Sequence, residues 1–174
     1  MVKKRKAIFF DRDGTIINTF VKKNKPIAIK TLKDLSLIKS VPFVFNKLKT
    51  KYKIFVITNQ PDVARGNNKK KNVIEINKEL MRNLPIEKVY TSYSSDNKNY
   101  NRKPNPGMIK KAKKQYNINL KKSYVVGDTE KDIIAGEKAG CKTILIKKKY
   151  NLNHYLGKSF YAKNLKDILK YIKF

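Results

Sequence analysis

Two carboxylates stand one residue apart in this chain, at the end of a short apolar run. Asp11 and Asp13 directly follow the apolar residues 7–10, and Gly14 and Thr15 come next. Such a run is typical of a buried parallel strand, and α/β folds place their chemistry just beyond the carboxyl ends of these strands. Alternate residues of an extended backbone point the same way, so both carboxylates can reach one site.

The crowding of these two acids indicates a cation site. Neighbouring carboxylates repel each other unless a cation or a shared proton relieves them. Magnesium suits this task, because it takes hard oxygen ligands and keeps positions for water and phosphate. The alternative is a strand end with solvated acids at a turn, and the Asp-x-Asp spacing alone does not separate the two.

Polar side chains also follow other apolar runs or lie in the loops between them. They are Thr58, Asn59, Lys103, Asp128 and Asp132. Taken singly, each has an ordinary structural explanation: a helix cap for Thr58, a surface lysine for Lys103 and a turn former for Asp128. Because the carboxyl ends of parallel strands converge on one crevice, we expect the whole set to meet there.

Strand-like and helix-like patterns alternate about five times along the chain. We expect strands at residues 7–10, 54–57, 89–91, 123–126 and 142–146, and helices at 44–52, 73–84, 106–116, 130–139 and 164–172. This alternation predicts an α/β fold with a parallel sheet, right-handed crossovers and helices on both faces. A loop or small hairpin is expected at residues 16–30. No repeat or linker divides the chain, so we expect one domain over residues 1–174.

The composition is strongly basic, since 42 Lys and Arg against 13 Asp and Glu give a formal net charge of +29. Basic surface favours nucleic acid, because phosphate backbones bind to it. The excess is nearly all lysine, however, and is spread over the chain with abundant Asn and Ile, a mixture that drift towards A/T-rich codons also produces. We expect non-specific attraction to polyanions and no specific nucleic-acid partner.

Other bulk features narrow the class of protein. A hydrophobic content of 40% argues against disorder, and no apolar run has the length of a membrane span. Cys141 is the single cysteine, which excludes an intrachain disulfide and fits a reducing cytoplasm. We expect a soluble cytoplasmic monomer without membrane contact, with Cys141 in a buried strand and His154 on the surface.

In order along the chain, these motifs resemble the haloacid dehalogenase-like phosphatases. The stretch Asp11–Thr15 resembles the first motif of that family, Thr58 the second, Lys103 the third, and Gly127-Asp128 through Asp132 the fourth. The resemblance covers nearly the whole chain. It implies a three-layer Rossmann-like core with a parallel sheet of about five strands and no cap domain.

The resemblance also implies a mechanism. Asp11 would be the nucleophile that attacks phosphorus, and Asp13 would protonate the leaving alcohol and then activate water. Thr58 and Lys103 would bind the phosphoryl oxygens as further catalytic residues. Magnesium would be held by metal-binding residues of the first and fourth motifs: Asp11, Asp13 through its backbone carbonyl, Asp128 and Asp132.

The substrate loops most resemble the heptose bisphosphate phosphatases and their sister family, the histidinol-phosphate phosphatases. The resemblance rests on Thr58-Asn59-Gln60, Ala64-Arg65-Gly66 and residues 102–108. It implies a small phosphorylated sugar as substrate, with these substrate-binding residues: Thr58, Asn59, Gln60, Arg65, Arg102 and Lys103. For Arg65, bracing its own loop is an equal alternative.

In one respect the chain departs from those families, which usually carry a zinc-binding Cys/His cluster before the Arg-Lys-Pro stretch. Residues 91–101 contain neither Cys nor His, and Cys141 and His154 cannot make a four-ligand site. We predict that no zinc is bound. The departure weakens the substrate assignment, because this loop borders the pocket.

Two rival interpretations remain open. The first keeps the chemistry but changes the substrate to histidinol phosphate or a DNA 3′-phosphate end, for which Tyr90, Tyr93 and Tyr100 could stack on bases. The second is a nucleic-acid-binding module that uses this fold without catalysis. The intact set of motif residues argues against the second rival, which fold alone could not exclude.

Overall fold

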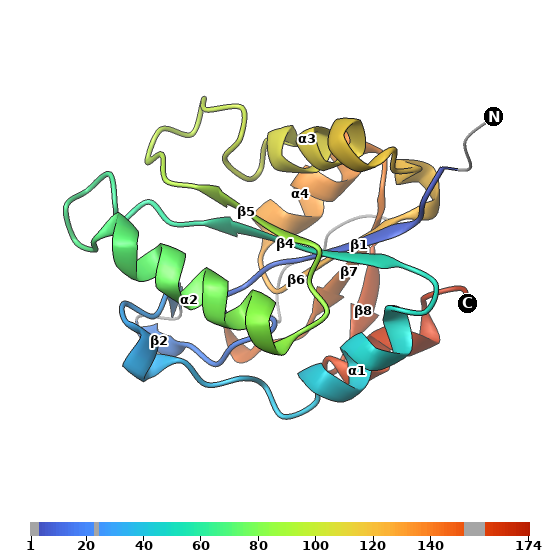
Figure 1. The fold of residues 1–174 in the computed structure, drawn as a ribbon, viewed down its shortest axis with the longest axis horizontal. Helices are drawn as coiled ribbons and strands as arrows, with labels where there is room; N and C mark the ends of the chain where they lie inside the picture. Colours follow the sequence, from blue (N-terminus) through green and yellow to red (C-terminus); the bar gives the residue numbers. More distant parts are fainter. Residues whose placement is uncertain (1–3, 23–24, 152–158) are drawn as a thin grey trace.

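The structure is a computed structural model that describes residues 4–22, 25–151 and 159–174. In this part of the chain, six parallel strands form a sheet in the order β5-β4-β1-β6-β7-β8 (Figure 1). They are β1 (Ala7–Phe10), β4 (Lys53–Asn59), β5 (Lys88–Ser92), β6 (Tyr124–Gly127), β7 (Lys142–Ile146) and β8 (Phe160–Ala162). The strand order reverses at β1, and ligands of such folds bind beyond the carboxyl ends of the strands at this point.

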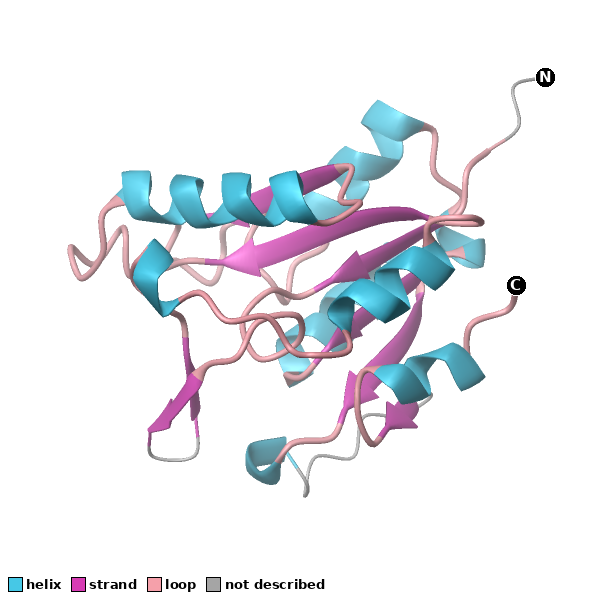
Figure 2. Ribbon diagram, turned by 60° about the horizontal axis from the view of Figure 1, so that its bottom comes forward, coloured by secondary structure: helices cyan, strands magenta, loops and turns pink. Residues whose placement is uncertain are grey.

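Helices cover both faces of the sheet (Figures 1 and 2). On one face lie α1 (Val41–Leu48) and α2 (Lys70–Asn83), and on the other lie α3 (Gly107–Tyr116) and α4 (Glu130–Ala139). Along β1, Ile8 and Phe10 join the core under α1 and α2, while Ala7 and Phe9 join the core under α3 and α4. Both faces of each central strand are therefore buried, which explains their continuous apolar sequences. The predicted three-layer α/β fold is confirmed.

A small antiparallel hairpin separates β1 from α1, as the sequence predicts. It consists of β2 (Phe20–Lys22) and β3 (Lys25–Ile27), and a 3-10 helix follows at Leu32–Asp34. In the described residues between β1 and α1, these are the elements that stand where a cap domain could be inserted. None of the helices in the described ranges combines the length and the apolar character needed to cross a membrane.

Several details differ from the expectations. The sheet has a sixth strand, β8, whose three residues are too few to show a pattern. The expected C-terminal helix is a 3-10 helix at Lys166–Lys170, because apolar residues three and four apart fit either helix type. Cys141 lies just before β7 and is only partly buried, because Gly140 ends α4 in a left-handed turn (φ 87°) and Cys141 completes the connection. His154 lies outside the described residues.

Candidate active site

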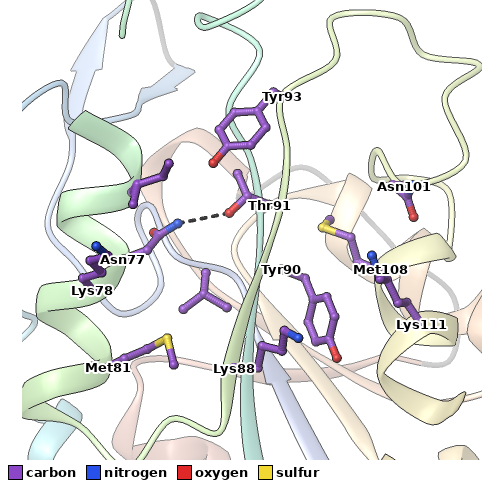
Figure 3. Close-up of a pocket in the computed structure, with 12 residues that line it drawn as sticks. Asn77, Lys78, Met81, Lys88, Tyr90, Thr91, Tyr93, Asn101, Met108 and Lys111 are labelled. Carbon is purple, nitrogen blue, oxygen red and sulfur yellow. Dashed lines mark hydrogen bonds between the residues drawn. The ribbon is translucent and has the colours of Figure 1, made fainter. Parts of the chain in front are cut away.

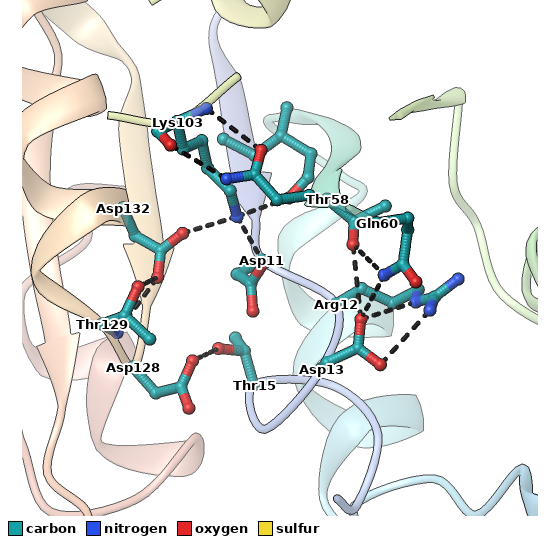
Figure 4. A network of polar contacts seen from close by, with 12 residues as sticks. Asp11, Arg12, Asp13, Thr15, Thr58, Gln60, Lys103, Asp128, Thr129 and Asp132 are labelled. Carbon is teal, nitrogen blue, oxygen red and sulfur yellow. Dashed lines mark hydrogen bonds and ion pairs between the residues drawn. The ribbon is translucent and has the colours of Figure 1, made fainter. Parts of the chain in front are cut away.

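An ion pair between Asp11 and Lys103 lies at the end of β1 (Figure 4). Lys103 comes from the loop between β5 and α3, and its ammonium also donates to Asp132 Oδ1 at 2.6 Å and to the carbonyl of Ile57 at 2.9 Å. Lys103 is only 4% exposed. Because an ammonium has three donors, these three acceptors satisfy it completely and fix its position.

Three buried carboxylates lie together beside this lysine. We call Asp11, Asp128 and Asp132 the acidic trio, since one oxygen from each lies within 4.8 Å of the others. Asp128 directly follows β6, and its two oxygens accept hydrogen bonds from Thr15 Oγ1 at 3.1 Å and from the hydroxyl of Tyr150. The trio therefore joins the ends of β1 and β6 to the start of α4.

Local backbone features bring these carboxylates close to one another. Asp132 caps α4, because its Oδ2 accepts from the backbone N–H of Thr129 at 3.0 Å and from the Thr129 hydroxyl at 2.6 Å. A Cβ atom on Gly127 would lie 2.3 Å from Cβ of Asp132, and one on Gly14 would lie 2.3 Å from Oδ2 of Asp128. Gly14 also has a φ of 86°, which other residues rarely adopt. Both glycines are therefore required by the site.

Burial raises the pKa of Asp11 well above its usual range, and the nearby carboxylates of Asp132, Asp128 and Asp13 raise it further against the opposing effect of Lys103. Burial, with a contribution from Asp132, raises the pKa of Asp128 to about 6. Burial alone would lower the pKa of Lys103, but Asp11 and Asp132 outweigh it and the pKa lies above its ordinary value. One ammonium does not neutralise three carboxylates, so their oxygens suit a divalent cation.

The carboxylate of Asp13 lies apart from the acidic trio (Figure 4). It accepts from Arg12 Nε at 2.9 Å, from Gln60 Nε2 at 2.8 Å and from Thr58 Oγ1 at 3.3 Å. Gln60 and Thr58 come from the end of β4 and are also bonded to each other at 2.8 Å. Thus Asp13 is held by groups that were predicted to bind substrate, and its carboxylate has its own position in the crevice.

Arg12 is a residue of the site that the sequence analysis did not single out. Its side chain is fully buried, pairs with Asp13 and donates from Nη1 to Asn77 Oδ1 at 2.8 Å. Asn77 on α2 in turn donates to Thr91 Oγ1 at 3.1 Å. The position of Arg12 between two carboxylates was the available signal, because a charge inside a buried strand end needs a partner. Asn77 carries no such signal.

The remaining predicted substrate residues take different positions. Asn59 bonds twice to the backbone of Lys103, donating to its carbonyl at 2.9 Å and accepting from its N–H at 3.0 Å. Arg102 is buried and donates to the carbonyl of Ser94 at 2.9 Å. Burial lowers the pKa of Arg102, and the positive charge of Arg65 lowers it further. Arg65 has a side chain that is 52% exposed and pairs with Asp62 at 3.5 Å.

Polar side chains hold the loop in which a zinc cluster was predicted to be missing. Arg102 Nε donates to Asn97 Oδ1 at 3.2 Å, and Asn105 Nδ2 donates to the carbonyls of Asn97 and Asn99, each at 3.0 Å. These bonds give the loop a means of support that involves no metal. The absence of zinc stays a prediction.

The three tyrosines considered for base stacking are not equivalent. Tyr90 is buried, packs against Phe55 and donates from its hydroxyl to Gln115 at 2.6 Å, so its ring is not open to a base. Lys70 lies over the ring of Tyr93, 5.3 Å from its centre. Tyr100 is 58% exposed.

A carboxylate at the end of the central strand, beside a buried lysine and two more carboxylates, defines a hydrolase of the haloacid dehalogenase-like class. Solved structures support this class through their fold. A D,D-heptose 1,7-bisphosphate phosphatase from B. bronchiseptica, complexed with magnesium and phosphate, superposes with a TM-score of 0.80 at 20% identity, covering 95% of this chain and 97% of that one. A putative HAD-like phosphatase from Mesorhizobium loti gives 0.74 at 24% identity, covering 96% and 84%.

The chain belongs to the polynucleotide kinase 3 phosphatase family, whose model matches residues 6–168. Curated relatives extend over its whole length. A D-glycero-alpha-D-manno-heptose-1,7-bisphosphate 7-phosphatase from Photorhabdus laumondii is 32% identical, covering 98% of both chains. A D-glycero-beta-D-manno-heptose-1,7-bisphosphate 7-phosphatase from Helicobacter pylori is 30% identical, covering 99% of this chain and 100% of the relative.

Replacing Asn59 by Ala tests whether this side chain positions Lys103. We expect kcat/KM for phosphate release to fall about 10- to 100-fold, because Lys103 loses its backbone anchor and reacting groups tolerate little misplacement. The matched control is Asn83→Ala, at the exposed end of α2, where Asn83 bonds only to Glu79. Equal activity of the two variants would contradict the positioning role.

The raised pKa of Asp128 predicts a pH dependence of stability in the metal-free protein. Its pKa moves from 3.8 to about 6 on folding, so the folded state binds the proton more tightly than the unfolded chain. The free energy of unfolding then falls as the pH rises through this interval, and protonation restores it. Thermal melts in EDTA should show that lowering the pH from about 7 to about 5 helps the wild type more than Asp128→Asn. An identical response of both proteins would contradict the shift.

Proposed function

We propose that this protein is a magnesium-dependent phosphomonoesterase that removes the 7-phosphate of D-glycero-D-manno-heptose 1,7-bisphosphate. The observation that carries the chemistry is the acidic trio with Lys103 paired to Asp11. The substrate comes from the relatives, because those cited above are named for this reaction and match the chain from end to end.

Asp11 acts as the nucleophile in this proposal. Its attack on phosphorus forms an aspartyl-phosphate and breaks the bond to the sugar oxygen. Asp13 donates a proton to that oxygen and then takes one from the water that releases phosphate. The separate position of the Asp13 carboxylate, held by Arg12 and Gln60, supports this division of roles.

The phosphoryl group needs positive charge and fixed donors around its oxygens. Lys103 supplies the charge beside the nucleophile, and Thr58 supplies a hydroxyl at the end of β4. Asn59 acts through Lys103, since both of its amide groups bond to the lysine backbone. We therefore assign Asn59 a positioning role, in place of the substrate contact that the resemblance implies.

The donor set fits magnesium, because three buried carboxylates share one ammonium and retain oxygens close to one another. Asp11, Asp128 and the backbone carbonyl of Asp13 would hold the ion, with Asp132 supporting it. When bound, the ion neutralises charge on the phosphoryl oxygens and orients them. Thr15 and Thr129 keep Asp128 and Asp132 in place for this role.

The second phosphate of the substrate needs a further cationic site. Arg102 and Arg65 are close enough for the charge of one to lower the pKa of the other. A phosphate bound between them relieves this repulsion, which supports their role in substrate recognition. The rest of the setting is a single-domain monomer in the cytoplasm, in keeping with its one cysteine.

A second candidate substrate is a DNA 3′-phosphate end. The family model takes its name from a polynucleotide 3 phosphatase, and the net charge of +29 favours a polyanionic substrate. The buried ring of Tyr90 weakens this candidate, because it removes one of the three expected stacking surfaces.

Asp11→Asn tests the nucleophile. We expect phosphate release to fall by about 10³-fold or more, because the amide cannot attack phosphorus. The variant should keep its fold, since the change removes one charge from a crowded group of acids. Asp167→Asn is the control, because Asp167 pairs with Lys170 away from the site. Substantial turnover by the folded Asp11→Asn variant would exclude Asp11 as nucleophile.

A substrate panel with magnesium separates the two candidates. It contains heptose 1,7-bisphosphate, fructose 1,6-bisphosphate, histidinol phosphate and a 3′-phosphorylated DNA oligomer, each with an EDTA control. We expect the highest kcat/KM for the heptose and no turnover in EDTA. A preference for the oligomer would establish the second candidate, and activity on none of the four would remove the phosphatase assignment.

A further inference from the structure

A groove of about 380 Å³ lies along the outer edge of β5, away from the crevice that holds the acidic trio (Figure 3). Strand β5 stands at the end of the strand order and pairs only with β4 among the described strands. Helix α2 forms one wall of the groove and α3 forms the other, and residues 88–91 form its floor. The groove thus presents the unpaired edge of a parallel sheet.

Backbone groups of this edge are oriented for pairing with another strand. Ser92 faces β4, because its carbonyl accepts from the N–H of Gln60 at 2.7 Å. Backbone groups of a parallel strand turn alternately to its two sides, so Tyr90 also faces β4 while Val89 and Thr91 face the groove. An extended chain laid along β5 can bond to these groups, as in recognition by strand addition.

The walls of the groove combine apolar side chains with positive charge. Ile74 and Met81 on α2 are 37% and 41% exposed. Lys78, Lys88 and Lys111 stand around them, and no acidic residue lines the groove. None of these three lysines forms an ion pair within the described part of the chain. The groove therefore has apolar surface and uncompensated positive charge beside an open strand edge.

We propose that the β5 edge is a docking site for an extended acidic peptide segment of a partner protein, bound by strand addition. Alternating acidic and β-branched residues match the groove, because carboxylates meet the three lysines while apolar side chains cover Ile74 and Met81.

Two other occupants fit less well. A second copy of this chain would bring the same three lysines against one another in a protein that already carries a charge of +29. Single-stranded nucleic acid needs open aromatic faces, but Tyr90 is buried and Lys70 lies over the ring of Tyr93.

The test uses the full-length protein and a fluorescein-labelled peptide of alternating Glu and Val, blocked at both ends. We expect saturable binding by fluorescence anisotropy, weakened about tenfold in Lys78→Glu/Lys111→Glu. The control is Lys49→Glu/Lys121→Glu, which changes the net charge equally at exposed positions outside the groove and should bind like wild type. Equal weakening in both double variants would show general attraction to polyanions and overturn the proposal.

Further measurements separate the mode of binding and the class of partner. A peptide with proline in place of each valine cannot donate backbone hydrogen bonds and should not bind, whereas equal binding would exclude strand addition. Amide exchange at Val89 and Thr91 should slow when the Glu-Val peptide is added, and unchanged exchange would contradict the site. Dimerisation abolished by the groove substitutions, or tighter binding of an oligodeoxythymidine that depends on them, would assign the groove to another occupant.

Discussion

Electrostatic repulsion among buried carboxylates is the constraint on which the rest of this structure depends. Asp11, Asp128 and Asp132 place oxygens within 4.8 Å of one another, and Lys103 contacts two of the three. Such a group is costly to bury unless each charge is bonded and the excess is neutralised. The raised pKa of Asp11 expresses this cost in the metal-free protein. Affinity for a divalent cation and a phosphoryl group is the functional counterpart of the same repulsion.

The fold meets this constraint by bringing separate strand ends to one point. β1 lies between β4 and β6, so the residues that follow these three strands converge beyond their carboxyl ends. Two glycines allow the close approach, because a Cβ atom on Gly14 or Gly127 would overlap the carboxylate side chains. The hydrogen bonds from Asn59 to the backbone of Lys103 then fix the one charge that comes from a long loop. Each support acts on a different segment, which keeps the site in a single geometry.

Most of this arrangement could be predicted from the sequence, because central parallel strands are continuous apolar runs and their ends carry the chemistry. The strand β8 could not, because three residues leave no recognisable pattern. Side-chain orientation was also beyond reach. Spacing indicates that Asp11 and Asp13 can point to one crevice, yet the bonds to Arg12 and Gln60 hold Asp13 apart from the acidic trio. Contacts from distant segments, such as the Tyr150 hydroxyl on Asp128, depend on the folded chain alone.

The account rests on covalent transfer of the phosphoryl group to Asp11. Acid quenching during turnover of heptose 1,7-bisphosphate, followed by borohydride reduction, converts an aspartyl-phosphate to homoserine that peptide mass spectrometry can locate. We expect homoserine at position 11 in the wild type, formed only when magnesium is present. Homoserine at another aspartate, or turnover with no trapped acyl-phosphate at any quench time, would contradict the assignment of Asp11 as the nucleophile.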